Sequence, residues 1–253
     1  MQITINGDDF GWSQSCTHAI LDAFEKNLIQ TTTMISTGAY FDEAAELVMD
    51  SEIKNNTGIH FDLTEGIPLT DGIKKDPFFC NKDGEFIILI NRTKSLTNEQ
   101  KRHAYNELKA QAERFKKTGL KFHHADSHHH IHTAPFILPI VMAVAKEYDI
   151  KKIRASRNYG EISAVKRLEK IIYNTRLAIS GNRYTKLFCS AEDYLKYDTK
   201  QRNSTLEIMV HPDYDNNGQL IDRDGEATYE SPYGAPLIFL AEGIKKRGDK
   251  LNK

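Results

Sequence analysis

Histidine residues concentrate in one short segment of the chain. Six of the ten histidines lie within residues 123–132, in the run HHADSHHHIH. A neutral imidazole is the commonest metal ligand in proteins. If this run is extended, His124, Asp126, His128, His130 and His132 share one face of a strand. One strand cannot direct all of them at one ion, so we expect one or two ligands here and further ligands from other strands.

Other polar residues of the same kind follow other predicted strands. Asp8 and Asp9 come directly after a first strand, His60 lies in a third, and His211 follows a late one. Beside a bound metal, one aspartate can coordinate the ion while its neighbour acts as a general base. Arg154 follows a further strand and could orient an aspartate or bind substrate. Each of these residues alone is weak evidence for a metal site. The prediction of such a site rests on their convergence at the ends of several strands.

The elements that must position these residues alternate along the chain. Apolar patterning and turn residues predict strands at 2–6, 31–36, 58–63, 120–127, 152–155, 186–189 and 206–210. Helices are expected at 13–27, 41–49, 97–117, 135–148, 161–180 and 235–246. Such alternation is typical of an α/β protein with a parallel sheet. About seven strands favour a single β/α barrel, distorted or incomplete, with its site at the C-terminal ends of the strands.

Composition excludes several other classes of protein. The 253 residues show no convincing domain boundary, so residues 1–253 are expected to form a single domain. A net charge of −1 provides no bulk attraction for nucleic acid or an anionic membrane, and no apolar run approaches the length of a membrane span. Three scattered cysteines without a C-x-x-C motif, and an N-terminus unlike a signal peptide, predict a cytoplasmic location.

Four segments carry a resemblance to a known family. They are NGDDFG at 6–11, GIHFDLT at 58–64, DSHHHIH at 126–132 and EIMVHP at 207–212. In this order they resemble the signatures of the YdjC-like carbohydrate deacetylases, which include chitooligosaccharide deacetylases. The first and third segments together are highly specific, and the resemblance spans residues 6–212.

The resemblance implies a barrel related to the polysaccharide deacetylases, one divalent metal, usually Mg²⁺, and removal of N-acetyl groups from sugars. It assigns Asp9, His60 and His128 as metal ligands. It assigns Asp8 as the catalytic base and His211 as the catalytic acid. Substrate contacts or support of the ligands are expected from Asp126, His130, His132 and Arg154.

Some points stay open in the sequence. Gly7 stands where the family usually has alanine, and residues 155–205 and the tail after Gly225 match only loosely. Two imidazoles and one carboxylate suit Zn²⁺ or another first-row metal as well as Mg²⁺. The expected partner is a small acetylated sugar, on which aromatic residues such as Trp12 could stack, and a homodimer is possible.

Two alternatives to the deacetylase remain. One is another metal hydrolase of the amidohydrolase or phosphoesterase type, although these commonly place a His-x-His pair after the first strand. The other is a non-catalytic, metal-dependent sugar-binding or regulatory protein, which would need the metal ligands but not Asp8.

Overall fold

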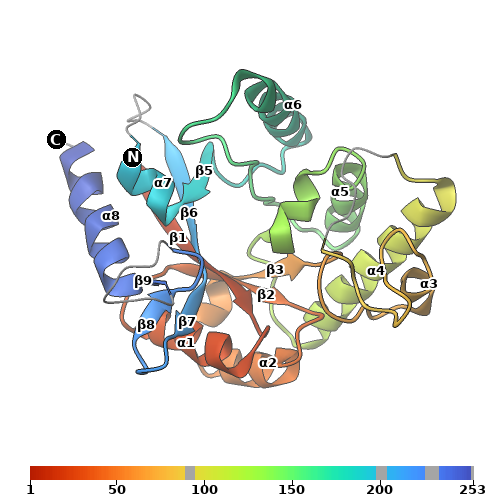
Figure 1. Ribbon diagram of the computed structural model, residues 1–253, viewed down its shortest axis with the longest axis horizontal. Helices are drawn as coiled ribbons and strands as arrows, with labels where there is room; N and C mark the ends of the chain where they lie inside the picture. Colours follow the sequence, from red (N-terminus) through yellow and green to blue (C-terminus); the bar gives the residue numbers. More distant parts are fainter. Residues whose placement is uncertain (89–94, 198–203, 226–233, 252–253) are drawn as a thin grey trace.

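A curled parallel sheet forms the centre of the protein (Figure 1). The computed structural model describes residues 1–88, 95–197, 204–225 and 234–251. The six strands lie in the order β4-β3-β2-β1-β6-β5. Their bounds are β1 (Gln2–Phe10), β2 (Thr31–Ile35), β3 (Thr57–Phe61), β4 (Ala125–Ser127), β5 (Leu187–Ser190) and β6 (Thr205–Val210). Every residue of β2 and β3 is buried, as expected for a parallel sheet covered on both faces.

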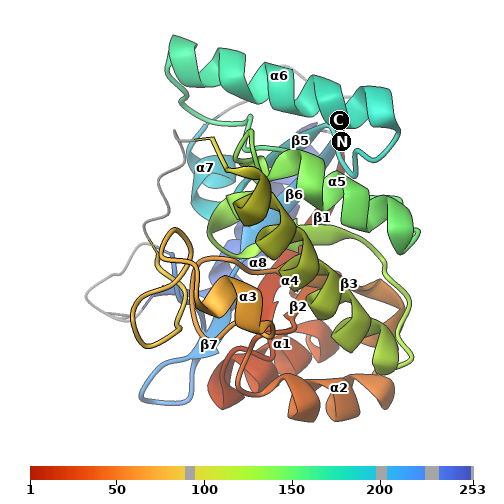
Figure 2. The same cartoon turned by 90° about the vertical axis from the view of Figure 1, so that its right-hand side faces the viewer.

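Helices lie around the outside of this sheet (Figure 1), and Figure 2 shows α4 and α5 along one side. Their bounds are α1 (Gln14–Glu25), α2 (Phe41–Met49), α3 (Asp71–Lys74), α4 (Asn98–Lys117), α5 (Leu138–Glu147), α6 (Ala164–Ser180), α7 (Ala191–Lys196) and α8 (Leu237–Leu251). Two expected helix starts are confirmed. The Ser13 side chain caps α1, and Thr97 and Gln100 form a capping box at the start of α4.

An irregular segment continues the barrel between β4 and β5. Ile153 forms parallel bridges to Ala125 on one side and to Arg183 on the other. Farther along, the Asn158 N–H donates to the Phe188 carbonyl in β5. The expected single β/α barrel, distorted and incomplete, is therefore confirmed, with six regular strands and residues 152–158 between its two edges.

Several predicted boundaries are wrong. The strand expected at 120–127 is regular only over 125–127, and the one expected at 152–155 is reduced to the bridge at Ile153. Residues 7–10 lie beyond the strand expected at 2–6, but they continue β1: Gly7 still pairs with Val210 of β6, and Phe10 pairs with Met34 of β2. No extended strand runs through the histidines, because residues 128–133 form a 3₁₀ segment, η2 (His128–Thr133).

A small antiparallel sheet and a second 3₁₀ segment were not expected. The sheet consists of β7 (Pro212–Tyr214), β8 (Leu220–Asp222) and β9 (Ala235–Pro236), and η1 (Glu52–Asn56) precedes β3. No helix in the described ranges is both long enough and apolar enough to cross a membrane.

Candidate active site

The polar residues singled out by the sequence meet at a cavity of about 560 Å³. Its lining comes from the ends of β1, β3, β4 and β6, which bring together Asp8, Asp9, His60, His128, His130 and His211. Trp12, Glu65 and Arg223 also line it. The site therefore lies where the carboxyl ends of parallel strands converge, as expected for a β/α barrel.

Irregular backbone conformations orient several of these side chains. The pairing of β1 with β2 shifts between Gly7 and Phe10, and Asp9 has a φ of 71°. His129 and His130 also have positive φ, at 49° and 53°. Asp and His adopt this left-handed conformation more readily than most residues, and such irregularities commonly redirect side chains at functional sites. Because His129 and His130 have positive φ, side chains in this segment do not alternate between two faces as they would in the expected extended strand.

Asp9, His60 and His128 form a compact cluster of possible metal ligands. Asp9 Oδ1 lies 3.2 Å from His60 Nε2 and 2.8 Å from His128 Nδ1, and all three residues are buried. Two ligands bound at right angles to one ion, each about 2.1 Å from it, are roughly 3 Å apart. His60 Nε2 makes no hydrogen bond although it is buried, which is costly unless another partner binds it. The three residues therefore fit a divalent cation.

Each candidate histidine ligand has a carboxylate on its other ring nitrogen. Asp126 Oδ1 lies 2.7 Å from His60 Nδ1, and Thr33 donates a hydrogen bond to Asp126 Oδ2. Glu65 Oε2 lies 3.1 Å from His128 Nε2. A carboxylate so placed holds the proton on its own side of the ring and orients the opposite nitrogen toward a metal. His60 Nε2 and His128 Nδ1 are thus both directed at Asp9.

The electrostatics of this cluster favour positive charge. Burial alone would lower the pKa of His128, but Asp9 and Glu65 raise it to about 9. The negative field that holds a proton on this ring would equally stabilise a cation beside Asp9. The indole of Trp12 stacks on the His128 ring, with centroids 5.2 Å apart, and restricts its orientation.

Arg154 holds three carboxylates together beneath the cavity. Its fully buried guanidinium lies 2.6 Å from Asp8 Oδ2, 2.7 Å from Asp126 Oδ2 and 2.6 Å from Glu207 Oε1. Burial opposes the charge on Asp8, but Arg154 outweighs it and lowers the pKa of that carboxyl. Burial raises the pKa of Glu207 to about 7 despite Arg154. Arg154 therefore keeps Asp8 ionised and fixed at neutral pH.

His211 follows β6 and lines the same cavity as Asp8. Its Nδ1 lies 3.7 Å from Asp222 Oδ1 and 3.3 Å from Asp224 Oδ2. Burial alone would lower the pKa of His211, but Asp222 and the charges of Asp9 and Asp8 raise it to about 9. The ring is therefore protonated at neutral pH and can donate a proton.

Of the remaining predicted site residues, His130 lies at the cavity and His132 does not. His130 lines the cavity, and burial together with the charge of Arg154 lowers its pKa to about 3, so the ring is neutral. His132 lies away from the cavity lining, pairs with the Ser127 hydroxyl and packs against Tyr173. Of these two residues, His130 thus lies at the cavity, while His132 packs behind the segment that carries His128.

Sequence reasoning missed three residues of the site. Glu65 follows the GIHFDLT segment directly, and this proximity was a usable signal. Glu207 lies in the EIMVHP segment, but only the fold shows its contact with Arg154. Arg223 donates to Asp9 Oδ2 at 2.9 Å. It follows the unexpected strand β8, so nothing in its local sequence identified it.

The chain is similar in sequence to proteins of one known family. The family model described as YdjC-like protein matches residues 2–234, a range that includes residues 155–205 and extends past Gly225. A carbohydrate deacetylase of Geobacillus stearothermophilus is 32% identical over 83% of this chain and 78% of its own length. A carbohydrate deacetylase of Halalkalibacterium halodurans is 31% identical over 85% of this chain and 86% of its own length.

A solved structure supports the same fold. An Enterococcus faecalis protein described as a cellobiose-phosphate cleavage protein superposes with a TM-score of 0.72. It is 24% identical, and the match covers 98% of this chain and 95% of that one. Together with the family match over residues 2–234, these findings show that the chain belongs to the YdjC-like protein family.

Proposed function

We propose that this protein is a metal-dependent carbohydrate deacetylase that removes N-acetyl groups from amino sugars or their oligosaccharides, chitooligosaccharides included. The names of its relatives support the activity. The observation that carries the proposal is the buried cluster of Asp9, His60 and His128 in one cavity with the ionised Asp8 and the protonated His211.

The proposed cofactor is one divalent cation held by Asp9, His60 Nε2 and His128 Nδ1. The family resemblance favours Mg²⁺, while two imidazoles beside a single carboxylate suit Zn²⁺ or another first-row metal. A bound divalent cation supplies Lewis acidity, which lowers the pKa of water and polarises a carbonyl oxygen.

The protein's own groups supply the proton transfers. Asp8 accepts a proton from the attacking water as the water oxygen bonds to the acetyl carbon. Arg154 holds both oxygens of Asp8, so the carboxylate stays ionised and points in one direction. His211 donates a proton to the nitrogen as the C–N bond breaks. The products are acetate and the free amine of the sugar.

Acetate release from N-acetylglucosamine and its oligomers tests the proposal directly. The protein is stripped of metal and reloaded in turn with Mg²⁺, Zn²⁺, Mn²⁺ or Co²⁺. Equal amounts of acetate and free amine, restored by one of these ions, are the expected result. Sugar binding that persists in Asp8→Asn, without turnover by the wild type, would instead support the non-catalytic alternative.

His128→Ala is expected to weaken binding of the activating metal by more than about 100-fold, beyond the usual effect of an outer partner. The variant removes one of three nitrogen or oxygen ligands from the cluster. Calorimetric titration with the metal measures the effect. His18→Ala is a matched control, because His18 is exposed on α1 and pairs with Glu43, away from the cavity lining. Equal metal affinity in His128→Ala and His18→Ala would remove His128 as a ligand.

The pH dependence of kcat/KM is expected to show a basic limb near pH 9, because His211 has a pKa of about 9 and loses its proton as the pH rises through that value. Asp222→Asn removes a negative charge beside the ring, lowers the pKa of His211 and moves the limb to lower pH. The Asn side chain can still accept the bond that the His211 backbone N–H donates to Asp222. A limb that stays in place in Asp222→Asn would rule out His211 as its source.

A cytoplasmic location remains part of the proposal. All three cysteines are free and buried, which is compatible with a reducing compartment.

A further inference from the structure

A second cavity, of about 550 Å³, lies between α6 and the chain that leads into β5, two elements that are neighbours in Figures 1 and 2. It shares no lining residue with the cavity that holds Asp8 and His211. Sites for small molecules usually have volumes of about 300–1,000 Å³. The second cavity is therefore large enough for a ligand of its own, separate from the proposed catalytic site.

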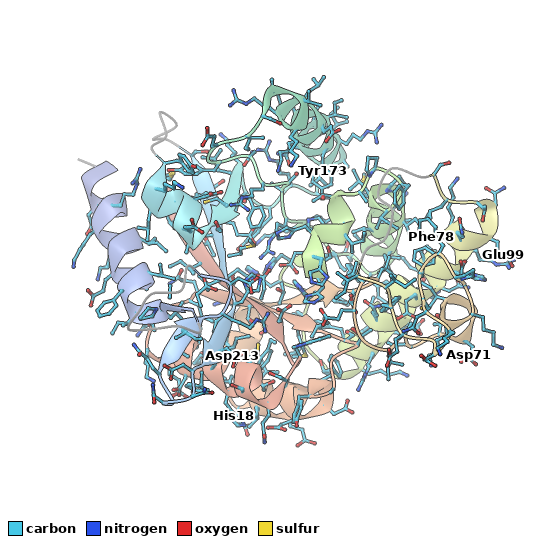
Figure 3. All side chains as sticks on the ribbon, in the orientation of Figure 1. His18, Asp71, Phe78, Glu99, Tyr173 and Asp213 are labelled. Carbon is cyan, nitrogen blue, oxygen red and sulfur yellow. The ribbon has the colours of Figure 1, made fainter. Side chains whose placement is uncertain are left out.

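Helix α6 supplies one wall of this second cavity. Its lining residues recur at helical spacing on one face of the helix, and they are Arg167, Lys170, Ile171, Asn174 and Thr175. Tyr173 points from α6 toward the body of the protein (Figure 3), and its hydroxyl donates to the Arg154 carbonyl at 3.2 Å. The Asn174 amide bonds to both the N–H and the carbonyl of Ser156. The wall is therefore fixed to the barrel.

The turn after α6 supplies another wall. Gly181 ends the helix in the left-handed conformation, with a φ of 76°, which is the usual way for the chain to leave a helix in a new direction. Arg183 and Lys186 follow it and line the cavity. Arg183 Nε donates to the Thr185 carbonyl at 2.8 Å, so its guanidinium is held against its own turn. The turn therefore adds two cations to the two that α6 contributes.

The charge in this cavity is not balanced by the protein. Four cationic side chains line it, and among its described lining residues none is acidic. Within the described chain, none of these four cations forms an ion pair with a carboxylate. Asp193, the acid that acts most strongly on Lys170, already pairs with Arg157. Burial and the charges of Arg157 and Lys166 lower the pKa of Lys170, so an anion bound beside it would relieve an unfavourable interaction.

We propose that this cavity binds a small organic ligand through a phosphate group, which is held by Arg167, Lys170, Arg183 and Lys186. Arginine and lysine are the usual side-chain ligands of phosphate, and cations on two walls can approach different oxygens of one group. The rest of the lining is partly apolar, from Ile162, Ile171 and Leu187. An organic group attached to the phosphate can pack on these side chains, so the ligand is a phosphate ester rather than free phosphate.

Calorimetric titration with inorganic phosphate at constant ionic strength tests the anion site. We expect saturable binding by the wild type. Lys170→Gln and Lys186→Gln should each weaken it by about 10-fold, because each removes a charged hydrogen-bond donor. Lys101→Gln, an exposed change on α4, is the matched control and should bind as the wild type does.

His128→Ala separates this site from the catalytic cavity. The variant alters only the proposed metal cluster, so phosphate affinity should be unchanged. Absence of saturable binding by the wild type would overturn the proposal. So would binding that is lost in His128→Ala but retained in Lys170→Gln, because it would place the phosphate at the catalytic cavity.

Phosphate esters test the apolar part of the cavity. Glycerol 3-phosphate and AMP differ in the size of the organic group, and at least one of them should bind more tightly than inorganic phosphate. Glycerol and adenosine, which carry no phosphate, should not bind. If inorganic phosphate binds as tightly as both esters, the assignment to an ester is wrong.

Thermal unfolding without added phosphate tests whether the cations repel one another. Lys170→Gln should unfold at the same temperature as the wild type or a higher one, because it removes a charge that its neighbours disfavour. Phosphate should then raise the unfolding temperature of the wild type more than that of the variant. A Lys170→Gln protein that is less stable than the wild type without phosphate would contradict the unbalanced charge on which the proposal rests.

Discussion

Asp8→Asn is expected to lower kcat for deacetylation by about 100- to 10,000-fold, the usual range for loss of a general base. Arg154 donates to both carboxylate oxygens of Asp8, and Asp8 lies outside the proposed set of metal ligands. The amide of Asn keeps the shape, and its Oδ1 can still accept hydrogen bonds from Arg154 and Asn6, but its Nδ2 cannot accept the second bond from Arg154. It also loses the capacity to accept a proton from water.

The same variant should retain its metal. Asp9, His60 and His128 are untouched, so metal affinity should stay close to wild type, while the loss of one charged partner of the buried Arg154 should lower thermal stability. Asp71→Asn, an exposed change on α3, provides a control for the loss of one negative charge. Activity of Asp8→Asn within a few-fold of wild type would remove Asp8 as the base.

Arg154→Met is expected to destabilise the fold by about 3–5 kcal/mol, the usual cost of leaving buried charge unpaired. Arg154 is the shared cationic partner of Asp8, Asp126 and Glu207, and it stacks on the Phe188 ring, 4.7 Å from its centroid. Met fills a similar volume, so the loss comes from charge rather than from a cavity. Chemical denaturation measures the change.

The loss in Arg154→Met should depend on pH. Arg154 lowers the pKa of Asp8 in the folded protein, so its stabilisation is present at neutral pH and disappears as the pH falls through that pKa. Without Arg154 the buried carboxyls can be protonated more easily, so the deficit should be smaller at acidic pH than at neutral pH. Arg102→Met, which removes an exposed pair with Glu99, should cost less than about 1 kcal/mol. If Arg154→Met and Arg102→Met both lower the free energy of unfolding by less than about 1 kcal/mol, Arg154 is not the stabilising partner of the three buried carboxylates.

Much of the candidate site could be predicted because barrel topology converts sequence order into spatial convergence. Asp9, His60 and His128 are far apart in the chain, but each lies at the C-terminal end of a strand. Once the strands were placed in a parallel barrel, these residues had to meet at one end. The fold class could be predicted for the same reason, from alternating periodicities.

The details that depend on long-range contacts could not be predicted. The partners of Arg154 come from three separate strands, and the contact of Arg223 with Asp9 arises from a small antiparallel sheet with weak local signals. The positive φ values at His129 and His130 end the predicted alternation after Ser127. Such conformations are stabilised by surrounding packing and leave no periodic trace in the sequence.

The most direct test of the central proposal is the position of a bound cation. Crystals grown with Mn²⁺ should show one anomalous peak about 2.0–2.3 Å from Asp9, His60 Nε2 and His128 Nδ1. The structure offers two competing buried clusters, Asp8 with His60 and Asp126, and His124 with Asp126 and Glu207, and in both the guanidinium of Arg154 should repel a cation. A peak at either competing cluster, or none beside Asp9, would contradict the proposed metal site.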